Sequence, residues 1–353
     1  MSSFGEKRTL GIKIPLSTGW LLASCMEARG KQELWTRQKP EVLKALRDQA
    51  IVQSVESSNR IEGVTVDANR LRPLVVGNAR PQDRPEEEIA GYRRALDWIF
   101  TSKRPIGVSP ATILKLHSLA QGGMIGDAGK WKTRNNEIVE LRPDGERVVR
   151  FVPTSAKQTP GAVEALCQEY LEVSAMKALP DLLLISSFVL DFLCIHPFRD
   201  GNGRVSRLMT SLLLEQTGFV VSRYVSLERL IEESRDSYYQ SLHKSSQGWH
   251  DSIHDTLPWW DYFLSIVSRA YREFSEAVES RDGGANKTEL VRQVIAGTEG
   301  QFSLSGIRSQ LPSVSDQLIR RVLQQMKADG SLRLVGRGRG ARWERLEPTR
   351  KRA

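Results

Sequence analysis

The sequence predicts a mainly α-helical protein with one β-hairpin and a small C-terminal winged-helix domain. In most segments the apolar residues recur at three- and four-residue steps, which is the period of a helix with one buried face. An alternation of period two, typical of a hairpin, is clear only at 134–152 within the first 280 residues. A polar, Gly-rich stretch at 281–286 separates this helical body from a short module that follows it.

Residues 1–63 are expected to form an N-terminal helical segment. The stretch LSTGWLLASCMEA predicts one short helix, and Pro40–Ile61 predicts a longer one because its apolar residues lie three or four positions apart. Gly63 ends this second helix. A polar, Pro-containing stretch (GNARPQDRPEEE) then leads to the next helix of the core, which we expect to span 64–280.

Within the core, helical periodicity alternates with short polar breaks. The hairpin strands NEIVEL and RVVRFV flank a turn at Pro143-Asp144-Gly145, and Ser109-Pro110 opens one of the helices as N-cap and first helical residue. The other helices are predicted at 87–100, 159–175, 181–195, 204–216, 229–244 and 258–280.

The module after the expected linker at 281–286 has the outline of a winged-helix domain over 287–348, followed by a basic tail at 349–353. Its two strands are expected in SLRLVGRGRGARWERL, around a tip rich in Gly and Arg. Three short helices precede them, at Thr288–Ala296, Ser303–Gln310 and Ser315–Ala328.

The positive charge is concentrated in this module. Of the net charge of +9, residues 287–353 carry +8, from fourteen Lys and Arg against six Asp and Glu. The first 286 residues are therefore almost neutral. This distribution indicates that only the C-terminal module faces a polyanion.

A cytoplasmic location and no membrane contact are expected. The N-terminal residues lack the apolar region and cleavage site of a secretory signal. The most apolar run, 182–195, is too short to span a bilayer and contains Asp191. Cys25, Cys167 and Cys194 show no metal-ligand spacing, which is typical of buried thiols in a reducing compartment.

Twelve consecutive residues, His196 to Arg207 (HPFRDGNGRVSR), carry the strongest chemical signal. Gly201, Asn202 and Gly203 let backbone N–H groups converge in a concave nest, directly before a helix whose N-terminus favours an anion. Arg204 and Arg207 lie three positions apart, so they share one helical face and can reach further phosphate oxygens. The pattern indicates a polyphosphate site.

Two other residues of this segment add chemistry. Asp200 offers a hard carboxylate oxygen, of the kind that Mg²⁺ binds when phosphates supply its other ligands. His196 is the side chain whose ordinary pKa suits a general base at neutral pH. Each feature alone is more often structural. Their joint occurrence after a buried apolar helix favours an active site for Mg²⁺ and a nucleoside triphosphate.

The segment resembles the Fic family signature, H-x-F-x-[DE]-G-N-G-R-x-x-R, at every specified position, and the helix order resembles a Fic core across roughly residues 60–270. The resemblance implies transfer of AMP from ATP to a Ser, Thr or Tyr hydroxyl of a protein, with release of pyrophosphate. It implies that His196 deprotonates the acceptor, Asp200 binds Mg²⁺, and Asn202 with the loop N–H groups holds the α-phosphate. Arg204 and Arg207 would engage the β- and γ-phosphates.

Gly203 bears on which group is transferred. Fic relatives that phosphorylate carry a lysine at this position and bind the nucleotide reversed, so the glycine favours AMP transfer. Phosphocholine transfer stays open on this loop alone. A transcriptional regulator whose body only senses nucleotide is open as well, although mere binding needs no base such as His196.

The end of the helix at Pro40–Ile61 reads SSNRIEG. As a helix C-terminus it has a suitable glycine, but Glu62 is unexpected because the helix dipole disfavours an anion there. The segment resembles the Fic inhibitory motif, [ST]-x-x-x-E-[GN], with Ser58, Glu62 and Gly63 in place. The resemblance implies that Glu62 pairs with Arg207 and excludes the γ-phosphate. In some relatives this glutamate supports removal of AMP, so a reverse activity is also open.

Two further segments resemble substrate-binding parts of Fic proteins. The hairpin at 134–152 resembles the flap, along which an extended segment of a target protein would add as a strand and bring its hydroxyl near His196. Tyr238 and Tyr239, in RDSYYQSL, resemble the segment that lines the adenine pocket. Tyrosines at this spacing are otherwise more often core residues.

The partner of the C-terminal module has two interpretations. A basic surface favours phosphate contact, so 287–348 could bind DNA, with Arg320 and Arg321 on the third helix. Alternatively the module binds protein and its charge keeps it in solution. Three further arginines lie in the expected wing: Arg337, Arg339 and Arg342. A homodimer is left open.

Overall fold

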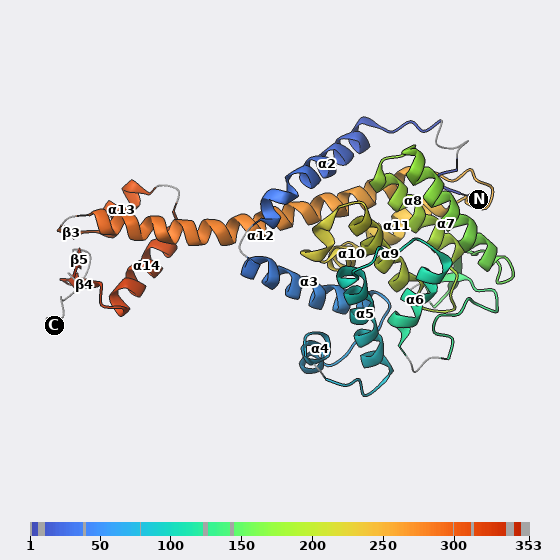
Figure 1. Ribbon diagram of the computed structural model, residues 1–353, viewed down its shortest axis with the longest axis horizontal. Helices are drawn as coiled ribbons and strands as arrows, with labels where there is room; N and C mark the ends of the chain where they lie inside the picture. Colours follow the sequence, from blue (N-terminus) through green and yellow to red (C-terminus); the bar gives the residue numbers. More distant parts are fainter. Residues whose placement is uncertain are drawn as a thin grey trace. The chain divides into compact units, whose positions relative to one another are not determined.

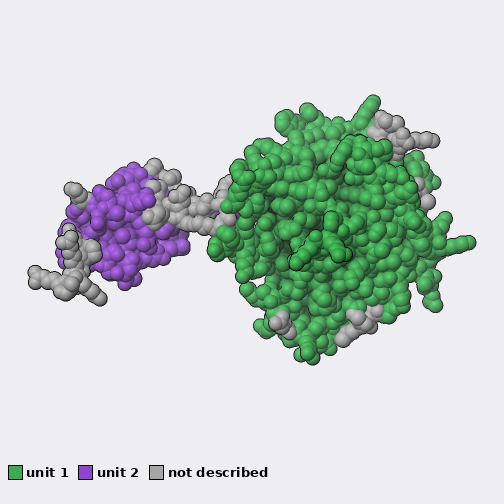
Figure 2. All heavy atoms as spheres, in the orientation of Figure 1, with its two compact units in different colours: residues 1–275 green, residues 276–353 purple. Residues whose placement is uncertain are grey.

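The computed structural model of the chain is mainly α-helical with small antiparallel sheets, which confirms the predicted fold class (Figure 1). The chain divides into two compact units, residues 1–275 and residues 276–353 (Figure 2). The structure describes residues 2–5, 11–37, 40–77, 79–122, 126–141, 145–298, 300–311, 314–336 and 342–346.

The division between the units falls inside one helix. Helix α12 spans Leu257–Gly297, so the Gly-rich stretch 281–286, expected to be an irregular linker, is helical instead. A glycine in a helix interior costs only about 1 kcal/mol relative to alanine. A helix of 41 residues tolerates that cost, because most of its turns lie outside the glycine pair.

Three of the first five helices that the structure describes in unit 1 begin at a capping side chain. Asp67, Asp83 and Ser109 each accept a hydrogen bond from a backbone N–H of the following turn. Helix α3 has the predicted bounds, and helix α2 is longer than expected. Helix α4, which precedes the polar stretch, was not expected. These helices are α2 (Leu16–Thr36), α3 (Pro40–Ile61), α4 (Ala68–Val75), α5 (Arg84–Thr101) and α6 (Pro110–Gln121).

The predicted hairpin is present as strands β1 (Ile138–Leu141) and β2 (Arg147–Phe151). They pair antiparallel, with Val139 opposite Val149, and the register shifts by a bulge after Ile138. The expected turn residues Pro143 and Asp144 lie outside the described residues.

Three of the remaining helices of unit 1, α7, α9 and α11, pack against α8, in which Leu182 to Phe192 are all buried, as expected for a core helix. The single helix expected at 229–244 is two helices, because the chain breaks at Ser234, whose hydroxyl contacts Leu230 O and the Tyr262 hydroxyl. The helices are α7 (Thr159–Met176), α8 (Asp181–Ile195), α9 (Asn202–Gln216), η1 (Val220–Arg223), α10 (Leu227–Glu233) and α11 (Arg235–Ser246).

Unit 2 has its own apolar core, which includes Ile295, Ile307, Val322 and Trp343. The helix expected at Thr288–Ala296 is the end of α12. The antiparallel sheet has the strand order β3–β5–β4. The elements are β3 (Gln301–Phe302), α13 (Leu304–Gln310), α14 (Asp316–Ala328), β4 (Leu332–Val335) and β5 (Arg342–Arg345). The expected wing tip with Arg337 and Arg339 lies outside the described residues, as does the tail at 349–353.

Two expectations from composition can be compared with the structure. The three cysteines are buried and unpaired, and burial raises the pKa of the Cys25 and Cys167 thiols to about 12. In the described part of the chain, no helix combines the length and the apolar character needed to cross a membrane.

A buried polar cluster ties residues 2–5 to α8. The backbone N–H of Ser3 donates to Asp191 Oδ2 over 2.8 Å, and its hydroxyl contacts Asp191 Oδ1 and His254 Nε2. Trp249 Nε1 donates to the same carboxylate over 2.7 Å. Burial raises the pKa of Asp191 to about 6 in spite of these donors.

This pKa predicts a pH-dependent stability. The folded protein binds the Asp191 proton more tightly than the unfolded chain, so this group stabilises the fold below about pH 4 and loses that contribution as the pH rises through about 6. When the pH is lowered from about 7 to about 5, we expect the free energy of unfolding of the wild type to rise by about 1 kcal/mol relative to that of Asp191→Asn. The asparagine does not titrate. Urea denaturation of both proteins at both pH values measures this gain. An unchanged difference between them would contradict it.

Candidate functional site

The segment between α8 and α9 is shaped by two residues in the left-handed region of backbone space. His196 ends α8 with φ 51° and ψ 61°, and Gly201 precedes α9 with φ 80°. This backbone conformation favours glycine at position 201, and a Cβ there would also lie 2.7 Å from Gln121 Nε2, so that side chain would have to move. The two turns place the loop 196–201 over the N-terminus of α9, where the first N–H groups have no helical acceptor.

Lys132 and Asn136 donate hydrogen bonds to carbonyl oxygens in this loop and at the end of α8. Lys132 Nζ donates to Ile195 O over 3.2 Å, and its backbone N–H donates to Pro197 O over 2.9 Å. Asn136 Nδ2 donates to Phe198 O over 3.2 Å. Since these acceptors are engaged within the protein, the loop is left to present N–H groups to a ligand.

Phe198 and His117 fix the centre of the loop. The buried Phe198 ring stacks on the His117 ring, with centroids 3.7 Å apart, and on Trp131. His117 Nδ1 accepts from Gly129 N over 2.9 Å, so Nε2 carries the proton and donates to Asp200 O over 3.1 Å. Burial lowers the pKa of His117 to about 4, which keeps this neutral tautomer at physiological pH.

Sequence reasoning assigned no role to His117, Lys132 or Asn136. They lie more than 60 residues before their partners in the loop, and nothing in their local pattern distinguishes them from ordinary helix and loop residues. Only the fold brings them together with the motif.

His196 has the arrangement of a general base. Its Nδ1 lies 3.2 Å from Leu193 O, and because a carbonyl can only accept, Nδ1 carries the proton. The other nitrogen, Nε2, is then an acceptor. Burial, together with the nearby positive charge of Lys132, lowers the pKa of His196 to about 4, so the ring is neutral at physiological pH.

Arg207 lies against the end of α3. Its Nε donates to Ser58 Oγ over 2.9 Å, and one terminal nitrogen donates to Ser58 O over 2.9 Å and to Glu62 Oε1 over 2.7 Å. This is the pairing that the resemblance implied. The side chain is 4% exposed, and its NH1 atom is buried with no hydrogen-bond partner among the described residues. An acceptor is therefore missing at this atom.

Gly203 lies beside this pair. A Cβ at Gly203 would collide with Glu62 Oε1 and would lie 3.1 Å from Arg207 NH1. A larger residue at position 203 is thus incompatible with the observed position of Glu62. Gly63, directly after Glu62, takes φ 79°, which lets the chain turn away after α3.

Arg204 differs from the expected phosphate ligand. Its side chain is 1% exposed, and NH1 forms an ion pair with the equally buried Glu88 over 2.6 Å. NH2 donates to Gln121 Oε1 over 3.2 Å. In this state the guanidinium is enclosed by protein groups, so Arg204 joins α9 to α5 and α6 instead of facing the cavity.

The amide of Asn202 is engaged in the loop. Its Oδ1 accepts from Phe198 N over 2.9 Å, and its Nδ2 donates to Phe198 O over 2.8 Å. Asn202 was expected to hold a phosphate directly. The structure shows it closing the loop, which leaves the backbone N–H groups as the available donors.

Asp200 is the carboxylate expected to bind Mg²⁺. Its side chain is 51% exposed, and Oδ1 accepts from Gly201 N over 2.7 Å. No group of three His, Cys, Asp or Glu that could hold a metal occurs among the residues that the structure describes. One exposed carboxylate suits an ion that takes its remaining ligands from phosphates and water.

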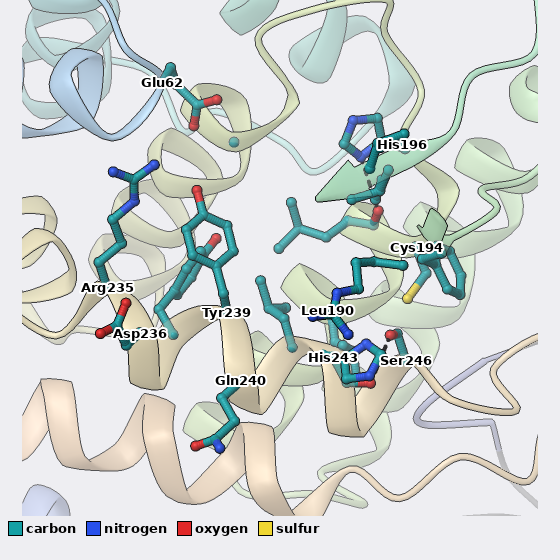
Figure 3. Close-up of a pocket in the computed structure, with 18 of the residues that line it drawn as sticks. Glu62, Leu190, Cys194, His196, Arg235, Asp236, Tyr239, Gln240, His243 and Ser246 are labelled. Carbon is teal, nitrogen blue, oxygen red and sulfur yellow. Dashed lines mark hydrogen bonds between the residues drawn. The ribbon is translucent and has the colours of Figure 1, made fainter. Parts of the chain in front are cut away.

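A cavity of about 860 Å³ is lined by His196 and Glu62, whereas Asp200, Asn202 and Arg204 are not among its lining residues. Figure 3 shows Glu62 and Tyr239 on one side of it and His196 and Cys194 on the other. Gly203 and Arg207 line the same cavity, as do hairpin residues from both strands. Of the two tyrosines expected at the adenine pocket, Tyr239 is 45% exposed and Tyr238 is buried, with the two rings packed edge to face.

Comparison with known proteins connects this geometry to one family. Residues 107–214 match the model of the Fic/DOC family. The protein adenylyltransferase fic-1 of Caenorhabditis elegans is 28% identical over 240 residues, and its Caenorhabditis briggsae counterpart is 29% identical over 237 residues. Each match covers 65% of this chain, and the chain spans 40% of the length of these relatives.

Solved structures share the fold. A Fic family protein from Desulfovibrio desulfuricans G20 superposes with a TM-score of 0.61 at 20% identity, covering 96% of this chain and 98% of that one. A segment of Fic-1 from C. elegans superposes with a TM-score of 0.59 at 22% identity, covering 75% of this chain and 73% of that one. The chain therefore carries a Fic/DOC family domain at residues 107–214, within a fold that Fic structures share.

Proposed function

We propose that this protein is a protein adenylyltransferase, which transfers AMP from ATP to a Ser, Thr or Tyr hydroxyl of a target protein. The observation that supports this most is the position of His196, a neutral ring with an accepting Nε2, in the same cavity as Gly203 and Arg207. The curated relatives, which are named protein adenylyltransferases, point to the same reaction.

In the proposed reaction the acceptor oxygen attacks the α-phosphorus as its proton passes to His196 Nε2. The bond between the α-phosphorus and the bridging oxygen breaks, and pyrophosphate leaves. The N–H groups at the start of α9 would hold the α-phosphate, where negative charge is present throughout the step. Mg²⁺, held by Asp200 and the phosphates, would neutralise charge on the leaving group.

We propose that Glu62 restrains this reaction. Its carboxylate occupies a guanidinium that a γ-phosphate would otherwise engage, and the unsatisfied NH1 of Arg207 marks where a further acceptor is needed. ATP could then bind in a pose unsuited to attack. Phosphorylation, the alternative that a lysine at position 203 would favour, is disfavoured by Gly203. Phosphocholine transfer and removal of AMP remain alternatives.

The hairpin would position the target. Ile138 and Val139 of β1 and Arg150 and Phe151 of β2 line the cavity that contains His196. An extended target segment that adds to this hairpin by backbone hydrogen bonds would bring its hydroxyl to the cavity mouth. Tyr239, exposed on α11 in the same cavity, offers a ring face to adenine.

Replacing Glu62 should activate the protein. We expect Glu62→Gly to raise the rate of AMP incorporation into lysate proteins at least about tenfold, equivalent to about 1.4 kcal/mol or more of barrier height. The reason is that Arg207 becomes available to the γ-phosphate. ATP labelled at the α-phosphate measures the rate. The matched control is Glu56→Gly, six residues earlier and within α3, where the carboxylate pairs with Arg60 instead. Equal rates for Glu62→Gly and the wild type would refute restraint by Glu62.

The low pKa of His196 predicts that the rate of AMP transfer changes little when the pH falls below neutrality. A histidine with an ordinary pKa would be only about one-tenth neutral at pH 5.5, and the rate would fall about tenfold from its value at pH 7.5. With its pKa near 4, His196 stays neutral at both values in the free protein, so we expect kcat/KM of Glu62→Gly for ATP to change by less than about twofold. A tenfold fall, in protein that stays folded by circular dichroism, would contradict this assignment.

A second function is supported for unit 2. Helix α14 exposes Gln317, Arg320, Arg321 and Gln324, and neither arginine forms an ion pair among the described residues of the unit. Arginine and glutamine are the side chains that contact phosphates and base edges when a recognition helix enters the major groove. We propose that residues 287–348 form a winged helix that binds duplex DNA. A protein partner is the alternative.

An electrophoretic shift tests this interface. We expect Arg320→Ala with Arg321→Ala to weaken binding to a random duplex at least about tenfold and to reduce the salt dependence by about one counterion per arginine. The control variant, Arg308→Ala with Arg333→Ala, removes the same charge from arginines that already pair with carboxylates in this unit. No shift by the wild type at low salt, or equal losses in both variants, would refute the interface.

Two further proposals concern the whole protein. A homodimer is tested by light scattering coupled to gel filtration, which reads the mass of the particle directly. A cytoplasmic location is tested by fractionating the cells that produce the chain.

A further inference from the structure

Arg84 lies at a position that the reaction described above does not use. It is the first residue of α5, whose start is fixed by the Asp83 side chain accepting from Glu86 N over 2.9 Å. From there the guanidinium reaches two carboxylates. Its Nε donates to Glu88 Oε1 over 2.8 Å, and its NH2 donates to Asp200 Oδ2 over 3.1 Å.

Glu88 holds this guanidinium in place. The Glu88 side chain is 1% exposed, and its other oxygen pairs with the buried Arg204. An ordinary exposed ion pair loses most of its strength to the disorder of two long side chains. In the pair of Arg84 with Asp200, the buried Glu88 carboxylate fixes the arginine, so its charge stays beside Asp200.

Asp200 does not depend on Arg84 for its orientation. Its Oδ1 is fixed by the Gly201 N–H, within the loop itself. Its Oδ2 lies 3.1 Å from Arg84 NH2 and 3.8 Å from Arg204 NH2. Arg84 therefore contacts the carboxylate oxygen that the loop N–H does not engage, which is the one left for a metal.

We infer that Arg84 is a built-in competitor of Mg²⁺ for Asp200. The inference rests on the proposed function, in which Asp200 supplies a ligand to the ion. Without the metal, the Arg84 guanidinium neutralises the carboxylate beside the nucleotide site. When Mg²⁺ arrives with ATP, the guanidinium gives up Asp200 Oδ2 and keeps Glu88, since two cations cannot share one oxygen without repulsion. Arg84 thus sets the Mg²⁺ concentration that the site requires.

The expected effect is modest because the contact is solvated. The side chains of Arg84 and Asp200 are 58% and 51% exposed, and pairs of this kind are weak even when their geometry is good. Loss of the Arg84 charge should tighten Mg²⁺ binding by about two- to fivefold. A positioning role would have the opposite sign, because a carboxylate without its orienting partner would bind the metal less well.

Calorimetric titration of Mg²⁺ into protein saturated with a non-hydrolysable ATP analogue tests the inference. All variants carry Glu62→Gly, so that the nucleotide is not restrained. Arg84→Gln removes the charge but keeps a donor for Glu88, and Arg84→Met is a second neutral variant in case the amide disturbs the fold. Arg84→Lys keeps the charge. Arg94→Gln is the matched control on the same helix, since Arg94 pairs with Glu87 away from Asp200.

We expect the Kd for Mg²⁺ to fall about two- to fivefold in the neutral variants and to stay unchanged in Arg84→Lys and Arg94→Gln. Equal Kd values in Arg84→Gln and Arg84→Lys would overturn the inference, and a higher Kd in the neutral variants would replace it with a positioning role. Binding of the analogue in EDTA is measured first. If the analogue does not bind in EDTA or with Mg²⁺, the proposed function fails, whereas normal binding with an unchanged Kd for Mg²⁺ defeats only the role of Arg84.

Discussion

The candidate site depends on the hydrogen bonds that the backbone of the loop between α8 and α9 forms. Donors from outside the motif hold its carbonyl oxygens: Lys132 takes those of Ile195 and Pro197, and His117 takes that of Asp200. Because protein donors already bind these carbonyl oxygens, the N–H groups of the loop are left to bind a ligand. The N-terminus of α9 adds the positive end of a helix dipole, which favours an anion. A backbone acceptor also fixes the tautomer of His196, since the Leu193 carbonyl decides which ring nitrogen carries the proton. The proposed anion site and the proposed general base thus both depend on backbone hydrogen bonds.

The two motif arginines have different roles because their partners differ. Arg204 pairs with Glu88, a carboxylate that is 1% exposed and cannot leave without exposing two charges to an apolar interior. Arg207 pairs with Glu62, which is 26% exposed and lies at the end of a helix next to a glycine in the left-handed region. Glu62 can move towards solvent, but the buried Arg207 guanidinium then needs another anion in its place. Arg204 therefore supports the fold, and Arg207 is the guanidinium that a ligand could gain.

Much of this could be predicted from the sequence, and the remainder shares one physical cause. Helix periodicity predicted α3, α8 and α9, and alternation predicted the hairpin. The resemblance of SSNRIEG to the Fic inhibitory motif implied the contact between Glu62 and Arg207. The break at Ser234 was missed because a serine in a helical pattern gives no sign of the tertiary hydroxyl contact that it makes. Arg84, His117 and Lys132 were missed for the same reason. Each acts on residues 60 or more positions away, and a single sequence does not show such pairings.

The central claim is that the cavity supports attack by a hydroxyl on the α-phosphorus, with His196 as base. Parallel reactions of Glu62→Gly with lysate proteins and ATP, labelled at the α-phosphate in one and at the γ-phosphate in the other, test this most directly. The structure predicts α-label on protein, no γ-label, and loss of the α-label when His196→Ala is added. Incorporation of γ-label, or α-label that persists without His196, would contradict the account.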